Sequence, residues 1–497
     1  MKDKVDQLIP VEEKKNVKKP HQNRFNTLTS KEWLPFQKSW FRFDGKEKLY
    51  KENVRFFTSA DKNLGTVYYY GPSVDVMQQV MNPLGHDVVT VDLDKCKKIQ
   101  YALIDLLDQV NENTSIDQFQ LIKKEIIQQV ERVYEQLAER RFLTVFIPNI
   151  QSANNYFPFA WDLAKDISTI ISLKDEKIAC IESGLAKTNT DFFQPSNKHF
   201  YCLHFRKDEH SQGAFREKKV PFFSNNKQQV NGRQFQNDIA SWFILKPQPR
   251  KKNEILHPAK YPESLVEMFI KEFTKEGDAV FDPMSGTGST QMAALKLGRS
   301  GYGTELSSFF SEIANERCSE LLKQKEFGDA GKETIACKII NKDARAVNEK
   351  DFQPFDYIIT SPPYWDMLNM KGAENQAKRL EKGLQTNYSD SDKDLGNISD
   401  YNDFLQSLCE IYLSITRQLK PGGYITIVVK NIKKKGRNYP FAWDLCSELQ
   451  KGLILLPEVF WCQDDISIAP YGYGNTWVSN TFHQYCLTFQ KPIKSSP

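Results

Sequence analysis

The sequence predicts an α/β fold built around an open sheet, and three observations carry this prediction. A short strand runs through a glycine-rich turn into a helix at residues 279–295. An apolar strand at residues 355–359 ends abruptly at two prolines, and a block containing a long helix, a strand and a tryptophan motif occurs twice. Ligands of open α/β sheets bind at the carboxyl ends of the strands. Both special turns lie at such ends.

The glycine-rich turn predicts a nucleoside site. Ala279-Val-Phe281 leads into Asp282-Pro-Met-Ser-Gly-Thr-Gly-Ser-Thr290, and a helical pattern then begins. Such a turn presents backbone N–H groups at a helix N-terminus to a polar or negative ligand. A lone Gly-x-Gly also occurs in ordinary tight turns, but two further strands support the site. One ends at Glu305, a suitable acceptor for a ribose diol, and the next is followed by Asp343, a suitable acceptor for an adenine amino group.

The second special turn is Thr360-Ser361-Pro362-Pro363-Tyr364-Trp365, which follows the apolar run 355–359. Each proline removes a backbone donor and fixes its own φ, so the strand cannot continue. A small hydroxyl, carbonyl groups and two large aromatic side chains are left at the strand's end. Taken alone, this stretch could equally be a proline-rich turn capped by packed aromatic residues. The glycine-rich strand upstream favours a binding site.

An internal duplication organises the rest of the chain. Asn149 and Asn431 are each followed by isoleucine and, twelve residues on, by the tryptophan of an identical Pro-Phe-Ala-Trp-Asp-Leu block, at Trp161 and Trp443. The blocks themselves predict a helix start whose apolar residues face a sheet. The same order recurs in the preceding helices (115–138 and 399–419) and in the later strands Tyr201-Cys-Leu-His-Phe205 and Tyr485-Cys-Leu-Thr-Phe489. Internal repeats of this kind indicate a repeated structural unit.

The two copies differ where chemistry is expected. By position, we expect Asp87-Val-Val-Thr-Val-Asp-Leu93 to correspond to the strand before Ser361, yet it has no Ser-Pro-Pro-Tyr and no Gly-x-Gly turn precedes it. The first copy should therefore be catalytically silent. The basic run 433–437 of the second copy is replaced by residues 151–155, which carry no charge, so the basic run is a candidate for phosphate contact.

The two turns together resemble those of the S-adenosylmethionine-dependent DNA amino-methyltransferases, which modify cytosine at N4 or adenine at N6. The resemblance extends from about Glu254 to Pro492, and includes His257-Pro-Ala-Lys-Tyr-Pro262 and Leu419-Lys-Pro-Gly-Gly423. It implies a Rossmann-like class I methyltransferase sheet, here with a degenerate N-terminal duplicate of the catalytic half. The first copy precedes the cofactor region and the second follows it. We therefore expect a remnant of permutation by duplication, with the first copy now a scaffold or DNA clamp.

The resemblance also implies roles for individual residues. Asp282, Gly286 and Gly288 would hold the methionine part of S-adenosylmethionine, Glu305 its ribose and Asp343 its adenine. Ser361, Pro362 and Tyr364 would hold the target base. The full expected cofactor set is Lys260, Asp282, Pro283, Gly286, Gly288, Ser289, Thr290, Glu305 and Asp343, and the expected catalytic set is Ser361, Pro362, Pro363 and Tyr364.

Physical chemistry supports these roles for the catalytic motif. An exocyclic amine is a poor nucleophile because its lone pair is delocalised into the ring. Acceptors such as the Ser361 hydroxyl and the Pro362 carbonyl can bind its N–H groups and turn the lone pair towards the methyl group. The base must leave the duplex to be reached, and Tyr364 offers it a stacking face. A cytosine-C5 enzyme would need a Pro-Cys nucleophile, and the sequence contains no such dipeptide.

Composition limits the remaining possibilities. The nine cysteines are scattered without a C-x-x-C pair, and no metal-site spacing occurs. The N-terminus lacks a signal-like apolar stretch and no run of about 18 apolar residues is present, which predicts a cytoplasmic protein. The net charge is only +4, so DNA contacts are expected from local clusters. The candidates are Arg250, Lys251, Lys252, Lys433, Lys434, Lys435 and Arg437.

Four domains are expected from these patterns. They are an N-terminal tail with an aromatic segment (1–65), a degenerate methyltransferase-like half (66–209), a basic linker or target-recognition segment (210–253) and a catalytic domain (254–497). Recognition of the DNA sequence could fall to 207–253, to the loop 371–400 or to the aromatic segment. The sequence leaves the oligomeric state open.

The expected activity is methylation of a flipped base in double-stranded DNA at a short recognition sequence, beside a cognate restriction endonuclease. Ser rather than Asp or Asn at position 361 favours cytosine N4 over adenine N6. The same motifs are also compatible with an RNA base methyltransferase and with a non-catalytic DNA-binding subunit built on this fold.

Overall fold

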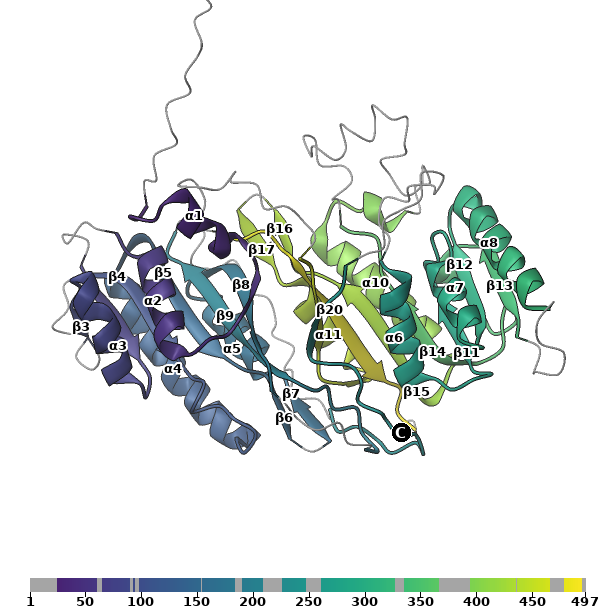
Figure 1. Ribbon diagram of the computed structural model, residues 1–497, viewed down its shortest axis with the longest axis horizontal. Helices are drawn as coiled ribbons and strands as arrows, with labels where there is room; N and C mark the ends of the chain where they lie inside the picture. The colour runs from purple at the N-terminus through teal and green to yellow at the C-terminus, as the bar shows by residue number, and fades with distance from the viewer. Residues whose placement is uncertain are drawn as a thin grey trace, which may run out of the picture.

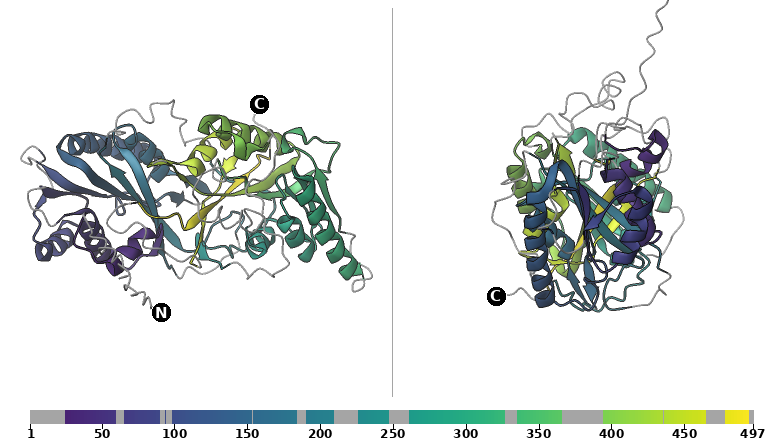
Figure 2. Two further views of the ribbon diagram at one scale, coloured as in Figure 1. Left: turned by 90° about the horizontal axis from the view of Figure 1, so that it is seen from above. Right: turned by 90° about the vertical axis from the view of Figure 1, so that its left-hand side faces the viewer.

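A computed structural model describes residues 25–59, 65–89, 93, 98–152, 154–183, 190–208, 226–246, 261–326, 335–365, 394–434, 436–464 and 478–493. The chain forms two halves that lie side by side along the long axis (Figures 1 and 2). We call residues 39–206 the N-terminal half and residues 241–490 the C-terminal half, because each range contributes one large sheet.

The N-terminal half, with two short elements before it, contains α1 (Ser30–Trp33), η1 (Leu34–Gln37), β1 (Trp40–Arg42), α2 (Lys46–Phe57), β2 (Thr66–Tyr70), α3 (Val74–Met81), η3 (Asn82–Leu84), β3 (Val88–Val89), β4 (Ile99–Asp105), α4 (Ile116–Gln136), β5 (Leu137–Ile147), β6 (Ile150–Ser152), β7 (Asn155–Phe157), α5 (Phe159–Ile167), β8 (Ser172–Ile181) and β9 (Lys198–Arg206).

The C-terminal half contains β10 (Trp242–Ile244), α6 (Glu263–Phe273), β11 (Ala279–Asp282), α7 (Ser289–Lys296), β12 (Ser300–Glu305), α8 (Ser308–Glu326), β13 (Cys337–Asn341), η5 (Ala344–Ala346), β14 (Phe355–Thr360), η6 (Leu395–Asn397), α10 (Tyr401–Ile415), β15 (Leu419–Val429), β16 (Ile432–Lys434), β17 (Arg437–Tyr439), α11 (Phe441–Leu449), β18 (Ile454–Leu455), β19 (Val459–Cys462) and β20 (His483–Gln490).

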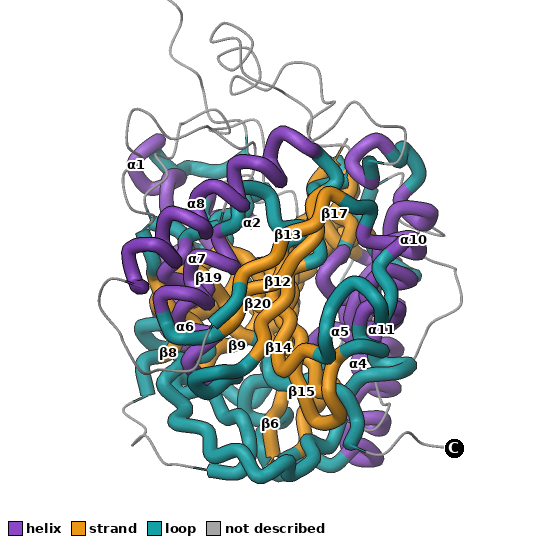
Figure 3. The backbone as a smooth tube through the Cα atoms, turned by 90° about the vertical axis from the view of Figure 1, so that its right-hand side faces the viewer, coloured by secondary structure: helices purple, strands orange, loops and turns teal. Residues whose placement is uncertain are grey.

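The two sheets have the same strand order over seven strands, and the second sheet adds β13 at its edge and β18 beside β20. The first runs β1-β8-β9-β5-β4-β2-β3 and the second β10-β19-β20-β15-β14-β11-β12-β13, with β18 paired to β20. Most neighbours are parallel, while β9 and β20 run antiparallel to the strands beside them. In the C-terminal half, α6, α7 and α8 cover one face and α10 and α11 the other (Figure 3). The predicted α/β fold is confirmed, and the predicted helices near 115–138 and 399–419 are α4 and α10.

The repeat is longer than the sequence suggested. Ser39-Trp-Phe and Ser241-Trp-Phe begin the two copies, and β1 and β10 pair in parallel with β8 and β19. The aromatic segment before residue 66 therefore contributes the strand β1 to the first sheet, and β10 belongs to the second. Both copies start before the boundaries expected at residues 66 and 254. The N-terminal copy also contains β2 and β3, the counterparts of β11 and β12, in the same chain order. It therefore repeats the whole sheet and not only the catalytic half, and the expected permutation was wrong.

The expected counterpart of the strand before Ser361 was wrong. Leu203 and Leu487 occupy matching places in β9 and β20, and they lie opposite Val145 and Ile427. Those two residues in turn lie opposite Ile104 of β4 and Thr360 of β14. The counterpart of β14 is thus β4, and Asp105 stands where Ser361 stands. Residues 88–89 form β3, which matches β12, and residues 90–92 lie outside the described part of the chain.

The two halves share one hydrophobic core on the side of α4, α5, α10 and α11. At its centre the fully buried indoles of Trp161 and Trp443 stack with ring centroids 6.3 Å apart and an interplanar angle of 15°. The opposite faces have separate cores, one under α2 and α3 and another under α6. The described cysteines are free thiols. Among the described residues, no helix has both the length and the apolar character needed to cross a membrane.

The Asn-to-Trp spacing of the repeat has a structural cause. Asn149 Oδ1 accepts from the Ala160 N–H (2.9 Å) at the start of α5, and its Nδ2 donates to Glu458 of the other half (2.9 Å). Asn431 makes the same pair of contacts, to Ala442 (2.8 Å) and to Glu176 (2.7 Å). Each asparagine therefore fixes a helix start and a contact between the halves at once.

Candidate active site

The glycine-rich loop lies at the carboxyl end of β11, between β14 and β12 in the sheet. Gly286 and Gly288 have φ angles of 52° and 80°, in the left-handed region that glycine adopts without strain. A Cβ atom on Gly288 would lie 3.0 Å from the Cβ of Ala314 in α8. The loop therefore needs glycine at position 288 both for its conformation and for its close approach to a helix.

Asp282 ends β11 and is 1% exposed. Its carboxylate accepts four hydrogen bonds, from the Met284 N–H (2.9 Å), Thr360 Oγ1 (2.7 Å), Tyr261 OH (2.9 Å) and Thr290 Oγ1 (2.6 Å). Burial raises its pKa, and these donors oppose the rise. Asp282 thus joins the glycine-rich loop to the end of β14. The sequence did not single out Tyr261 or Thr360 for this network.

Glu305, at the end of β12, faces the same loop. Its Oε2 accepts from the Gly286 N–H (2.8 Å) and its Oε1 from the Ser307 N–H (2.9 Å). Burial raises its pKa to about 7, since these two backbone donors offset only part of the desolvation. Each carboxylate oxygen can accept a second hydrogen bond. The arrangement suits a ligand with two neighbouring hydroxyl groups.

The other expected cofactor residues lie around these two acids. Asp343 caps η5 and forms an ion pair with Arg345 (Nη2 to Oδ2, 2.7 Å), so an adenine amino group would have to share or displace that contact. The Pro283 carbonyl accepts from Thr304 Oγ1 (2.8 Å), and Ser289 is buried in the first turn of α7. Lys260 lies outside the described residues.

Replacing Glu305 by glutamine should change how stability depends on pH. The folded state holds a proton on Glu305 more tightly than the unfolded state, so this group stabilises the fold fully below about pH 4.5 and loses that contribution as the pH rises through about 7. Relative to wild type, Glu305→Gln should therefore gain up to about 3 kcal/mol between pH 4.5 and 8. Urea unfolding at several pH values measures this, with Glu320→Gln as the exposed control. A difference that does not vary with pH would contradict the prediction.

The Ser-Pro-Pro-Tyr turn lies at the end of β14, near the middle of the sheet. The Ser361 hydroxyl donates to the Val428 carbonyl (3.1 Å) at the end of β15. The ammonium of Lys430 lies 4.7 Å from the ring centre of Tyr364, and burial lowers the pKa of this lysine. Burial also raises the pKa of Tyr364 to about 12, so the phenol stays neutral at physiological pH.

Trp365 packs against other aromatic residues, as we expected for a proline-rich turn capped by packed aromatic residues. It is 4% exposed and packs against Tyr401 and Tyr439, with ring centroids 5.3 and 5.0 Å away. The ammonium of Lys434 lies 3.9 Å from its ring centre. These residues line a cavity of about 920 Å³ between α10, α11 and the N-terminal half. The aromatic pair therefore divides into a packing residue and the more accessible Tyr364.

The residues of the basic run 433–437 make different contacts. The ammonium of Lys433 bonds the buried carboxylate of Asp175 and the Ser479 carbonyl (2.9 Å), so it joins the two halves. We expected Lys433 to meet phosphate, and this position does not fit that expectation, because a carboxylate already holds its ammonium. The sequence alone does not show which lysine of the run faces a carboxylate. Lys434 and Arg437 lie over aromatic rings beside the cavity. Lys435, Arg250, Lys251 and Lys252 lie outside the described residues.

The N-terminal half lacks the loop that a nucleoside would need. Only residues 71–73 join β2 to α3, whereas residues 283–288 join β11 to α7. Asp105, at the position of Ser361, is fully buried, bonds the hydroxyl of Tyr50 and lies 3.2 Å from the ammonium of Lys46. Tyr50 also contacts Tyr69, which stands at the place of Asp282 (O···O 3.1 Å). Aromatic and charged side chains thus fill this strand end.

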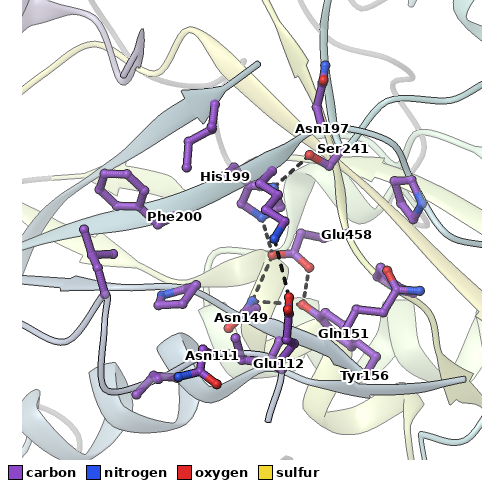
Figure 4. A pocket seen from close by; sticks show the side chains of 18 of the residues that line it. Asn111, Glu112, Asn149, Gln151, Tyr156, Asn197, His199, Phe200, Ser241 and Glu458 are labelled. Atoms are coloured by element: carbon purple, nitrogen blue, oxygen red, sulfur yellow. Dashed lines mark hydrogen bonds and ion pairs between the residues drawn. The ribbon is translucent and has the colours of Figure 1, made fainter. Parts of the chain in front are cut away.

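A cavity of about 740 Å³ remains beside that strand end (Figure 4). Glu458 of the C-terminal half reaches into its wall, where it bonds His199 (2.8 Å), Asn149 and Tyr156. Within the described ranges, no group of three or more His, Cys, Asp or Glu side chains could hold a metal ion.

Comparison with known proteins finds a family model that includes the glycine-rich loop. A family model described as DNA methylase, of the N6/N4 type, matches residues 73–316, from α3 to α8. This match assigns residues 73–316, just under half of the chain, to the N6/N4 DNA methylase family. The match runs through most of the N-terminal half into the glycine-rich loop and stops before Ser361. S-adenosylmethionine is the cofactor of this family.

Individual known methyltransferases are similar to parts of the chain. The orphan methyltransferase M.BamHII of Bacillus amyloliquefaciens is 48% identical over 61 residues, which cover 12% of this chain and 23% of that protein. The type II methyltransferase M2.MboI of Moraxella bovis is 30% identical over 125 residues, which cover 24% of this chain and 45% of that protein. The matched region spans less than half the length of these relatives.

Proposed function

We propose that this chain transfers a methyl group from S-adenosylmethionine to the exocyclic amino group of a flipped base in duplex DNA, with cytosine N4 the favoured target. The observation that carries the proposal is the junction of two strand ends. Asp282, which anchors the glycine-rich loop, accepts a hydrogen bond from Thr360, the residue before Ser361. A cofactor held by the loop and a base held by the Ser-Pro-Pro-Tyr turn would therefore be neighbours.

The residues at the loop fit a nucleoside cofactor. The second acceptor site on each oxygen of Glu305 suits the two ribose hydroxyls, and the left-handed glycines leave the backbone bare for close approach. When bound, S-adenosylmethionine supplies a methyl group on a sulfonium, which is a good leaving group. Asp282 would act as a positioning residue, because its four hydrogen bonds already fix the loop. The roles of Asp343 and Lys260 remain predictions.

The Ser361 hydroxyl is oriented for binding an amine. Because it donates its own hydrogen to the Val428 carbonyl, its lone pairs are left to accept from an N–H of the target base. The Pro362 carbonyl offers a second acceptor. Such acceptors would draw the amino group out of conjugation and turn its lone pair towards the methyl group. Tyr364 would stack on the base, which is worth about 1–3 kcal/mol.

Contacts to the DNA backbone are proposed for Lys434 and Arg437, which lie next to the turn. The names of several relatives place them in type II systems, so a restriction–modification role with a cognate endonuclease is proposed for this chain too. Adenine N6 is the second candidate target, because Ser361 and Tyr364 do not exclude a purine.

Labelled S-adenosylmethionine tests these candidates directly. The protein is incubated with unmodified genomic DNA or with RNA, and the nucleosides are then identified by mass spectrometry. We expect N4-methylcytosine in DNA. N6-methyladenine would select the second base, and label in RNA alone would change the substrate class. No transfer from a preparation that binds the cofactor would leave a DNA-binding subunit as the better description.

A further inference from the structure

The segment Val428–Lys434 connects the catalytic turn to the N-terminal half. On one side, the Val428 carbonyl accepts from Ser361 and Lys430 lies over the ring of Tyr364. The segment leaves β15 at Val429 and enters the β16–β17 hairpin at Ile432. A shift of this segment would therefore move two of the groups that contact the proposed base site.

On its other side, the segment is held by two buried acids of β8. Asn431 Nδ2 donates to Glu176 (2.7 Å), and the ammonium of Lys433 bonds Asp175. Asp175 and Glu176 are 1% and 2% exposed. Burial would raise the pKa of Asp175, but Lys433 and Lys177 hold it below its usual value, so this carboxylate is charged.

Further hydrogen bonds fix the two carboxylates and the hairpin beside them. Tyr485 donates to Glu176 (2.9 Å), and the backbone N–H of Ser479 donates to Asp175 (2.7 Å). The Lys174 ammonium also donates to the Gly436 carbonyl (3.1 Å) at the tip of the β16–β17 hairpin. Buried polar groups that are hydrogen-bonded in this way fix their partners closely, and removing one partner is costly.

The reciprocal contact offers a built-in comparison. Glu458 of the C-terminal half holds Asn149, and it also accepts from Tyr201 (2.8 Å), as Glu176 accepts from Tyr485. The segment after β5 contains no counterpart of Lys430, because Pro148 stands there. This second network therefore holds an equivalent segment that leads to no catalytic turn.

We propose that Asp175 and Glu176, in the half without the catalytic motif, are positioning residues for methyl transfer. They hold Val428–Lys434 so that the Val428 carbonyl orients Ser361 and Lys430 packs on Tyr364. The inference rests on the proposed function for its catalytic consequence, while its structural consequence does not. A misplacement of about 1 Å can lower an enzymatic rate about 10²-fold.

Glu176→Gln and Glu458→Gln form a matched pair of variants. Both change one buried carboxylate in the contact between the halves, so the general loss of stability should be similar. Amide hydrogen exchange, followed by mass spectrometry, reports on the fold without requiring activity. We expect faster exchange at 428–434 but not at 146–152 in Glu176→Gln, and the reverse in Glu458→Gln. Asn431→Ala and Asn149→Ala provide a second pair if the glutamine variants fail to fold.

Kinetics then tests the catalytic consequence. Glu176→Gln should lower kcat at least about tenfold with the KM for S-adenosylmethionine unchanged, whereas Glu458→Gln should retain kcat per folded molecule. Equal losses of kcat in the two variants, or unchanged exchange at 428–434 in Glu176→Gln, would overturn the positioning role. If wild type transferred no methyl group to nucleic acid, the proposed function would fail, while the exchange experiment would still decide whether β8 holds this segment.

Discussion

Replacing Ser361 by alanine is expected to lower the rate of methyl transfer about 10²- to 10³-fold and to leave the affinity for S-adenosylmethionine unchanged. The hydroxyl donates to Val428 and would present its lone pairs to the base amine, so its loss removes an acceptor that acts on the reacting nitrogen. The cofactor loop has no direct hydrogen bond to this side chain among the described contacts, which is why cofactor binding should persist. Single-turnover transfer to DNA and calorimetric titration of the cofactor measure the two quantities.

The N-terminal half provides the matched control for this variant. Asp105 stands at the equivalent strand end, so Asp105→Asn disturbs the same position in the half without the catalytic motif. Its transfer rate per folded molecule should equal that of wild type. A comparable rate loss in Asp105→Asn, or full activity in Ser361→Ala, would show that the catalytic site is assigned to the wrong strand end.

Replacing Trp161 by alanine is expected to lower the free energy of unfolding by about 3–5 kcal/mol. Its indole is fully buried where the halves meet, stacked on Trp443 and packed edge-on against Tyr485 (6.1 Å) and Tyr201 (6.4 Å). The cavity left behind would open the core that both halves share. The C-terminal half should therefore lose stability although the substitution lies in the other half.

Urea unfolding followed by a signal from each half tests that expectation. One transition that moves as a whole to lower urea indicates a shared core. Leu121→Ala is a suitable control, since its side chain is 71% exposed and should change the stability by less than about 0.5 kcal/mol. A transition of the C-terminal half that stays in place in Trp161→Ala would show that the halves are stable independently.

The sequence predicted those parts of the fold in which only one residue type can fill a position. Glycine at 286 and 288 adopts positive φ, and the asparagine–tryptophan spacing keeps a helix start and an interhalf contact together, so both leave a readable pattern. The register of β4 was not predictable in this way. Its residues up to Ile104 are all buried, and buried apolar residues can replace one another without leaving a mark.

The positions of the candidate site residues were predicted better than the contacts that hold them. The acids at strand ends and the Ser-Pro-Pro-Tyr turn lie where expected, because strand ends of one sheet edge must meet. Lys433 was misjudged, since its partner Asp175 lies 258 residues away in the sequence. Lys430 was not chosen over its basic neighbours, although the contrast with Pro148 in the other copy was visible. Long-range pairing of buried charges leaves no local pattern.

The asparagine–glutamate contact between the halves is made twice with the partners exchanged, as Asn149 with Glu458 and Asn431 with Glu176. In a complex of identical chains, such reciprocity defines an isologous interface about a two-fold axis. The two halves of the polypeptide thus meet as the subunits of such a dimer do, although they are joined in one chain. Identical subunits share one sequence, so a substitution changes both of them. Two halves joined in one chain can change separately. One of them has been free to do without a glycine-rich loop while it kept the surface that supports the other.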